Sequence, residues 1–311
     1  MTTRLGKTEI PPARTEALTR SAATRRWLRA ALETSRPRQW PKNLLVFAAP
    51  LAGASLGRDD GLAYALAAAA AFTAASAAVY FINDVADADR DRRHPTKRLR
   101  AVASGRLPAT HALALAAAAV TAAEVTSLSI GEPALAALIA VYVVFSSLYT
   151  LVLKHVPVVE LIFVAAGFVL RALGGAVATH VPPSAWFLVV CSLGALMVAT
   201  AKRFTELAVL GADATRHRPV MRWYTPAFLR LAQRVTTIVM ISAYLFWALS
   251  EHSGWMRGLH LASALPLTAA LMRFDWLTTH QPGKPVEDLI ARDGPMIGCE
   301  LAWLALFVAG L

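Results

Sequence analysis

Long apolar segments, separated by polar ones, constrain the fold of this chain more than any other feature of its sequence. A helix needs about 20 apolar residues to cross the ~30 Å hydrocarbon core of a bilayer. Nine segments fit this length within the usual tolerance: 42–57, 61–83, 107–129, 133–152, 156–179, 185–201, 233–250, 258–273 and 295–311. The sequence therefore predicts an all-α integral membrane protein with nine transmembrane helices.

The distribution of charge predicts how these helices are oriented. The chain has 31 Lys and Arg against 20 Asp and Glu, which in a soluble protein would suggest a nucleic-acid partner. Here the basic residues gather in the N-terminal arm and in the loops 84–106, 154–155, 202–232 and 274–294, whereas the alternate loops hold only Arg58 and Arg257. Because basic loops stay in the cytosol, we expect a multi-pass protein of the inner (plasma) membrane with a cytosolic N-terminus and no nucleic-acid partner.

The first 35 residues differ from the rest of the chain. They are polar and basic and lack the apolar core of a signal peptide, while Trp27, Leu28 and Leu32 stand among arginines. This pattern predicts a cytosolic arm, 1–35, with a candidate helix lying on the anionic leaflet. Residues 36–311 are expected to form one transmembrane domain.

A run of acidic residues follows the second apolar segment. Asn83, Asp87 and Asp91 recur at i, i+4 and i+8, and Asp84 lies three residues before Asp87, so a continuing helix would carry all four on one face. Stacked carboxylates repel one another unless a hard cation such as Mg²⁺ lies among them, usually together with phosphate oxygens. The alternative is a charged loop whose acids and bases neutralise each other. We predict a metal and phosphate site at the membrane surface, with Asn83, Asp84, Asp87 and Asp91 as metal ligands.

Basic and polar side chains at the cytosolic ends of other segments are the candidates for binding a phosphate-bearing substrate. Several have simpler explanations, because Lys154 can snorkel to the interface and Lys202 can serve the positive-inside rule. Lys42 is the exception, because it is expected on the same side of the membrane as the acidic run, where an ammonium can meet phosphate. Arg171 lies inside an apolar segment, where a charge is costly, so it is either functional or paired with an acid. The predicted substrate-binding residues are Lys42, Asn83, Tyr149, Lys154, Arg171, Lys202, Arg203, Glu206, Asp288 and Arg292.

Together these motifs resemble the UbiA superfamily of intramembrane prenyltransferases, which carry an NDxxDxxxD element after the second span. More closely, they are similar to the actinobacterial members that transfer phosphoribose to decaprenyl phosphate. The motifs that carry this likeness are RPRQWPKN, NDVADADRDRRHPTKRLR, ASGRLP, LYTLVLKH, FVLRALGG, KRFTEL and PVEDLIARD. The resemblance runs from about Arg36 to the C-terminus and implies a nine-helix bundle with a cavity that faces the cytosol.

One departure from the wider superfamily favours the narrower group. Typical members carry a second aspartate-rich motif after the sixth span, whereas this chain has KRFTEL there. Lys202 and Arg203 in place of acids suit a ligand with an additional phosphate, such as the 5-phosphate of phosphoribosyl pyrophosphate (PRPP). Glu160 stands where the narrower group is expected to have Asp, so its role is left open.

The resemblance implies a Mg²⁺-dependent transfer of 5-phosphoribose from PRPP to decaprenyl phosphate, with release of pyrophosphate, in the synthesis of arabinogalactan precursors for the cell wall. Asp84, Asp87 and Asp91 are then the catalytic residues. A candidate lid, which could equally contact lipid headgroups, comprises Arg92, Arg93, Lys97 and Arg98. A homo-oligomer is compatible with the sequence but not indicated by it.

The sequence is also compatible with two other functions. A conventional UbiA prenyltransferase would move a prenyl group from its diphosphate to an aromatic acceptor on the same metal face, and the missing second acidic motif argues against it. A non-catalytic lipid transporter would also tolerate an intramembrane Arg171. Transporters usually show internal repeats, and the sequence has no clear one.

Overall fold

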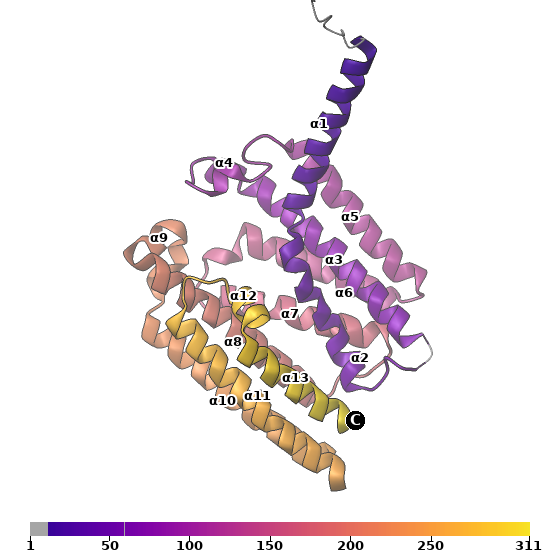
Figure 1. The fold of residues 1–311 in the computed structure, drawn as a ribbon, viewed down its shortest axis with the longest axis vertical. Coiled ribbons are helices and arrows are strands. Elements are labelled where there is room, and N and C mark those ends of the chain that lie inside the picture. Colours follow the sequence, from indigo (N-terminus) through magenta and orange to yellow (C-terminus); the bar gives the residue numbers. More distant parts are fainter. Residues whose placement is uncertain (1–11, 59) are drawn as a thin grey trace, which may run out of the picture. The chain divides into compact units, whose positions relative to one another are not determined.

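The computed structural model describes residues 12–58 and 60–311, and all regular secondary structure in these ranges is helical (Figure 1). The chain divides into two compact units, and the division falls inside three helical elements, η1 (Pro37–Phe47), α3 (Gly61–Ala86) and α5 (Ala109–Ser129). The first unit is Met1–Trp40 with Ser76–Ala119, and the second is Pro41–Ala75 with Val120–Leu311.

The first unit contains α1 and the segments around the acidic motif. Trp27 of α1 donates a hydrogen bond from Nε1 to Nδ1 of His111 at 3.2 Å, and Arg106 pairs with Glu33 at 2.7 Å. These contacts join α1 to the beginning of α5. The elements are α1 (Pro12–Thr34), the end of α3 (Gly61–Ala86), α4 (Ala88–Arg92), η2 (Lys97–Leu99) and the first part of α5 (Ala109–Ser129).

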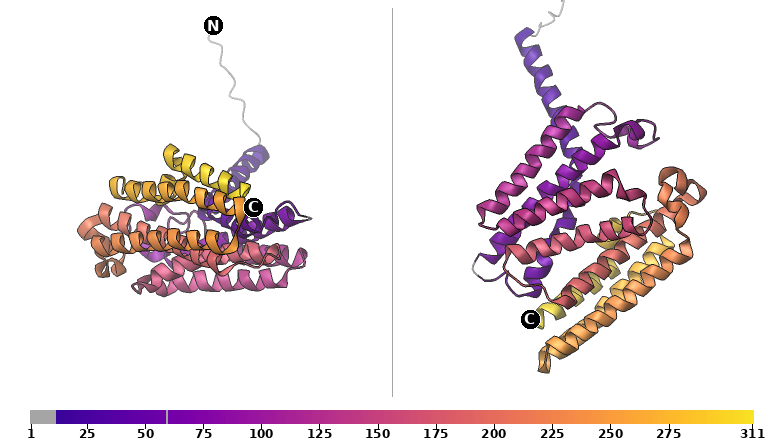
Figure 2. Two further views of the ribbon diagram at one scale, coloured as in Figure 1. Left: turned by 90° about the horizontal axis from the view of Figure 1, so that it is seen from below. Right: turned by 180° about the vertical axis from the view of Figure 1, so that it is seen from behind.

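The second unit is a bundle of long helices. Helix α7 packs against α6 and α8, α8 packs along α10, and α11 packs along both α10 and α13 (Figure 2). Short helices connect the long ones at several points. The elements are η1 (Pro37–Phe47, from Pro41), α2 (Ala48–Ala52), the first part of α3, the end of α5, α6 (Pro133–Leu151), η3 (Leu153–His155), α7 (Val159–Ala178), α8 (Ala185–Leu210), η4 (Gly211–Asp213), α9 (Ala214–His217), η5 (Pro219–Trp223), α10 (Pro226–Glu251), α11 (Gly254–His280), α12 (Val286–Arg292) and α13 (Gly294–Ala309).

Three of the long helices in the second unit begin at a side-chain cap. The side chains of Ser184, Thr225 and Asp293 accept hydrogen bonds from the backbone N–H three residues on, at 3.1, 3.1 and 3.0 Å. Such caps satisfy backbone donors that have no partner within the helix. The caps therefore determine where α8, α10 and α13 start.

Among the residues that the structure describes, six helices are long and apolar enough to cross a membrane: α3, α5, α6, α7, α8 and α10. Helix α13 is apolar but shorter, and α11 carries Pro266 within its length. The first predicted segment, 42–57, is not one long helix, because a 3₁₀ stretch containing Pro41 leads into a helix of only five residues. The all-helical membrane fold is confirmed for the described residues, and the count of nine spans stays a prediction.

Glycines allow two close approaches to α7. A Cβ built on Gly174 would lie 2.1 Å from the ring of Phe72, and one built on Gly175 would lie 1.7 Å from the carbonyl oxygen of Val46. Any larger residue at either position would therefore force the neighbour away. Small residues at helix contacts are the usual means of close packing within membranes.

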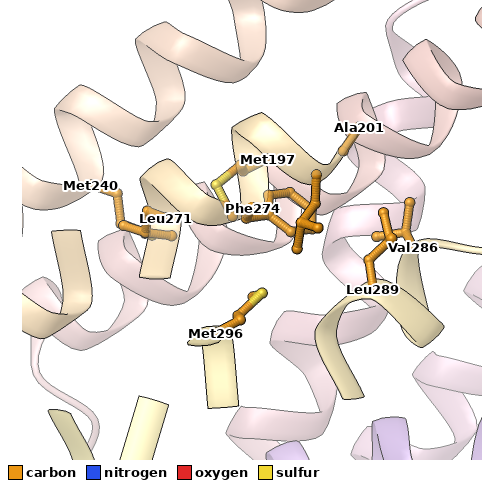
Figure 3. Close-up of a cluster of buried hydrophobic side chains, with 9 residues drawn as sticks. Met197, Ala201, Met240, Leu271, Phe274, Val286, Leu289 and Met296 are labelled. Atoms are coloured by element: carbon orange, nitrogen blue, oxygen red, sulfur yellow. The ribbon is translucent and has the colours of Figure 1, made fainter. Parts of the chain in front are cut away.

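A buried apolar cluster holds the short helix α12 in place. Val286 and Leu289, one turn apart, are each 2% exposed and pack with residues of α8, α11 and α13, among them Phe274 and Met296 (Figure 3). Asp288 and Arg292 consequently lie on the outer side of α12, where their side chains are 45% and 79% exposed. The packing of this face of α12 therefore fixes the position of Asp288 on the protein surface.

Truncating Leu289 tests this anchoring. Leu289→Ala should lower the free energy of unfolding by about 2–4 kcal/mol, because it removes buried methyl groups and leaves a cavity. Leu265→Ala is the matched control, since Leu265 is 75% exposed. The measurement is thermal or denaturant unfolding of both variants in the same detergent, and equal effects would contradict the assignment of α12 to the core.

Candidate functional site

The acidic motif lies where α3 ends and α4 begins. Asp87 separates the two helices with φ −92° and ψ 0°, close to helical values. Its N–H donates to the carbonyl oxygen of Asn83 at 2.9 Å, and the N–H of Asp91 donates to that of Asp87 at 2.8 Å. The i to i−4 hydrogen bonding thus continues across the break, so the predicted helical spacing of Asn83, Asp87 and Asp91 is largely kept.

Two buried carboxylates of the motif share one arginine. Arg100 approaches Asp91 at 2.7 Å and Asp84 at 3.5 Å, both through Nη1. Arg36 adds a second cation to Asp84 at 2.5 Å and lies over the ring of Tyr80. Both aspartates are buried, so without these guanidinium groups their charges would lack compensation.

The exposed side of the motif carries the residues of the predicted lid. Asp89 is 88% exposed and pairs only at the surface, with Arg92. Arg92 also donates from Nε to the carbonyl oxygen of Ala103 at 3.3 Å, which links α4 to the segment after η2. Arg93 and Arg98 are exposed and Lys97 is half-buried. Their role as a lid stays a prediction.

The donor chemistry of the acidic motif fits Mg²⁺. Within residues 12–58 and 60–311, no group of three or more His, Cys, Asp and Glu side chains forms a ready metal-ligand cluster. Mg²⁺, however, is commonly held by one or two carboxylates while substrate phosphates and water complete its shell. Asp84 and Asp91 contact the same guanidinium and offer only hard oxygen donors, so they suit such an ion, with Asp87 and Asn83 one helical turn away.

A second charged cluster lies in the second unit and contains two acids and two arginines. Glu160, fully buried in the first turn of α7, contacts Arg203 at 2.6 Å and Arg218 at 3.5 Å. Glu206 likewise contacts Arg203 at 2.6 Å and Arg218 at 3.6 Å. The four groups close a ring with no net formal charge, which we call the Glu160–Arg218 ring.

The two arginines of the ring differ in how firmly they are held. Arg203 is 8% exposed and makes short contacts with both acids, whereas Arg218 is 28% exposed and makes longer ones. Arg218 also lies 3.4 Å from the hydroxyl of Tyr149. Arg203 is therefore the structural cation of the ring, and Arg218 is the one more accessible to a ligand.

Arg171 has its own set of partners within the second unit. Its guanidinium donates to Oδ1 of Asn43 at 2.7 Å, to the hydroxyl of Tyr142 at 2.8 Å and to the carbonyl oxygen of Gly167 at 2.5 Å. It also lies 4.8 Å from the ring centre of Tyr142. Neutral oxygens and an aromatic face thus contribute to stabilising this intramembrane cation.

The structure brings only some of the predicted substrate-binding residues together. Arg203, Glu206 and Tyr149 meet in the Glu160–Arg218 ring, while Arg171 lies in its separate cage. Lys42, Lys154 and Lys202 are half-buried and engaged in contacts of their own. Asp288 pairs loosely with Arg292 at 3.5 Å on the surface of α12.

Sequence reasoning missed several members of these clusters. Arg36 and Arg100 belong to the motifs RPRQWPKN and NDVADADRDRRHPTKRLR, so their proximity to the acids was a usable signal. Arg218 had no such signal, because it lies among several basic residues between two long helices. Only the return of the chain through α9 and η5 brings it to Glu160.

Three features define the class of this protein: an all-helical membrane fold, an Asn-Asp acidic motif at a helix end, and buried arginines near apolar helices. The chain belongs to the UbiA prenyltransferase family, whose family model matches residues 44–287. Solved structures agree on the fold. A digeranylgeranylglyceryl phosphate synthase superposes with a TM-score of 0.67 at 16% identity and covers 91% of this chain and 98% of its own. A UbiA homologue from Archaeoglobus fulgidus bound to GPP and Mg²⁺ gives 0.65 at 16% identity, with 90% and 97% covered.

Similarity in sequence points to one group within this family. A decaprenyl-phosphate phosphoribosyltransferase from Mycobacterium tuberculosis is 36% identical over 278 residues, which is 87% of this chain and 90% of the relative. The enzyme of the same name from Corynebacterium glutamicum is 32% identical over 282 residues, with 89% and 85% covered. The one from Mycolicibacterium smegmatis is 33% identical over 297 residues, with 90% and 92% covered.

Neutralising Glu160 tests whether the Glu160–Arg218 ring is an ionic unit. Glu160→Gln should lower the free energy of unfolding by about 3 kcal/mol, because a buried Arg203 loses one of its two anions. Asp288→Asn removes an acid whose side chain is 45% exposed and should change stability little. Unfolding in detergent measures both, and a Glu160→Gln variant as stable as the wild type would contradict the interpretation.

Proposed function

We propose that this protein transfers the 5-phosphoribosyl group of PRPP to decaprenyl phosphate and releases pyrophosphate. The observation that carries the proposal is the likeness to three enzymes named decaprenyl-phosphate phosphoribosyltransferase, at 32–36% identity over most of both chains. The KRFTEL sequence after the sixth apolar segment agrees with it, since it supplies cations where a second metal-binding motif would otherwise stand.

The reaction needs little covalent help from the protein. A phosphate oxygen of the lipid forms a bond to C1 of the ribose while the bond from C1 to the pyrophosphate oxygen breaks, and the electron pair leaves with the pyrophosphate. The attacking phosphate monoester is already anionic near neutral pH, so no strong base is required. Positioning and neutralisation of charge can supply most of the rate.

The acidic motif is assigned to the pyrophosphate end of PRPP. Asp84, Asp87 and Asp91, with Asn83, would hold Mg²⁺, which stabilises the negative charge that develops on the leaving group. Arg36 and Arg100 neutralise the buried aspartates in the described structure. When a metal and a diphosphate bind, these guanidinium groups are suited to contact the diphosphate oxygens.

The cations of the second unit are assigned to phosphate groups. Arg203 and Arg218 offer guanidinium groups that pair well with phosphate, and Tyr149, Glu206 and Asp288 are candidates to orient phosphates or ribose hydroxyls. The remaining cations proposed to contribute are Lys42, Lys154, Arg171, Lys202 and Arg292, with Arg92, Arg93, Lys97 and Arg98 as a lid.

The setting of the reaction follows from the orientation of the chain. We infer that the charged loops lie in the cytosol, where PRPP is available, with nine spans, a cytosol-facing cavity and the arm 1–35 on the membrane surface. The product would enter the arabinogalactan precursors of an actinobacterial cell wall. In the described part of the arm, two arginines and two leucines are exposed at i, i+3, i+4 and i+7: Arg25, Leu28, Arg29 and Leu32. This pattern suits binding to the surface of an anionic leaflet.

A conventional prenyltransferase is the second candidate. It is favoured by the fold shared with UbiA homologues bound to GPP or DMAPP and Mg²⁺, although identity to these structures is only 16%. Such an enzyme would use the same acidic motif on a prenyl diphosphate. The sequence argument against it is KRFTEL in place of a second aspartate-rich motif.

Omitting components one at a time separates these candidates. Purified protein in detergent is given Mg²⁺, PRPP and decaprenyl phosphate, and pyrophosphate release and ribosylated lipid are measured. We expect both products only when all three components are present. Consumption of a prenyl diphosphate with an aromatic acceptor, and no use of PRPP, would overturn the proposal.

Replacing one acid of the motif separates catalysis from folding. Asp87→Asn should lower turnover on the order of 100-fold and raise the Mg²⁺ concentration needed for half-maximal rate, because a developing charge loses part of its stabilisation. Asp89→Asn is the control, because the Asp89 side chain is 88% exposed. If Asp87→Asn instead reduces only the yield of folded protein, Asp87 is structural.

A further inference from the structure

The residues before α7 form a turn that is unusual for their type. Val158 has φ +64° and ψ −48°, and the N–H of Val159 donates to the carbonyl oxygen of Pro157 at 2.7 Å. This is the γ-turn with positive φ, which is rare and strained, and a β-branched residue is especially disfavoured there. The turn therefore persists only if its surroundings hold it.

Packing of the Val158 side chain does not account for the strain. That side chain is 49% exposed, so it gains little from burial in the protein. The turn is spanned by a backbone hydrogen bond from the N–H of Glu160 to the carbonyl oxygen of Val156 at 3.1 Å. From outside the segment it is held by Tyr224, whose hydroxyl accepts a hydrogen bond from the N–H of Val158 at 2.8 Å.

Tyr224 is itself firmly placed. It is 5% exposed, stacks with Phe228 and packs among buried residues that include Val220, Met221 and Leu229. Its hydroxyl is thus a fixed point to which the beginning of α7 is attached. The connection joins segments 66 residues apart in the sequence.

The turn that this hydroxyl holds adjoins the Glu160–Arg218 ring. Glu160, a member of this ring, lies only two residues after the turn, in the first turn of α7. Burial first, and also the negative charge of Glu160, raise the pKa of Tyr224 above its ordinary value, against the lowering effects of the Val158 N–H and of Arg203. The hydroxyl consequently keeps its proton at neutral pH while it accepts from the backbone N–H of Val158.

We propose that Tyr224 is a positioning residue that holds the strained turn at Val158, and with it the start of α7 that carries Glu160, and thereby aims Arg203 and Arg218 at a phosphate group of the substrate. This inference rests on the proposed function, because it takes the Glu160–Arg218 ring as part of the phosphate site. Glu160 can orient both arginines only if its own helix starts in the correct register. The Tyr224 hydroxyl is placed to set that register.

Removing the hydroxyl alone tests the proposal. Tyr224→Phe keeps the aromatic ring in the core and should raise the KM for PRPP about tenfold, with a smaller effect on kcat, because the hydrogen bond that holds the start of α7 is lost. Tyr244→Phe is the matched control. Tyr244 is 4% exposed and its hydroxyl contacts Ser263 at 2.6 Å, so this variant loses an equally buried hydrogen bond that is not part of the ring.

A second pair of variants tests the role of the strain. Glycine adopts positive φ without penalty, so Val158→Gly in the Tyr224→Phe background should restore part of the affinity for PRPP. Val158→Ala keeps a Cβ at the strained position and should restore none. A merely structural role for Tyr224 would lower stability without this dependence on residue 158.

Assaying the wild type in parallel distinguishes failure of the positioning role from failure of the proposed function. If the wild type uses PRPP but Tyr224→Phe and Tyr244→Phe change its KM equally, or not at all, the positioning role is overturned and the proposed function stands. If the wild type does not use PRPP, the proposed function fails and this inference fails with it.

Discussion

Compensation of buried charge is the constraint on which the rest of this structure depends. A carboxylate or guanidinium removed from water must be paired or hydrogen-bonded, and the requirement is stricter beside a bilayer. Asp84 and Asp91 share Arg100, Glu160 lies between Arg203 and Arg218, and Arg171 is surrounded by neutral oxygens. Each cluster requires helices that are distant in sequence to be held in one register.

The three clusters compensate charge by different means. Asp84 and Asp91 share Arg100, and Asp84 also contacts Arg36. The two acids and two arginines of the Glu160–Arg218 ring orient one another by mutual pairing. Arg171 donates to oxygens of Asn43, Tyr142 and Gly167 and lies over an aromatic ring.

Small features of the backbone maintain these arrangements. The caps at Ser184, Thr225 and Asp293 determine where helices start, and the close approach at Gly174 and Gly175 determines how near α7 lies to its neighbours. The strained turn at Val158 belongs to the same group of features. It is the one that leads directly to a charged cluster, through Glu160.

The sequence by itself determined the membrane class, the helical fold and the family, because apolar length, basic loops and the NDxxDxxxD element are local patterns that depend on chain order alone. It also identified Asp84 and Arg171 as charges that need compensation. Their partners could not be read from it. That Arg100 serves Asp84, that Tyr142 serves Arg171, that Arg218 serves Glu160 and that Tyr224 serves Val158 was decided only by the tertiary structure. Pairing energy depends on distance in space, and these pairs are separated by 16 to 66 positions in the sequence.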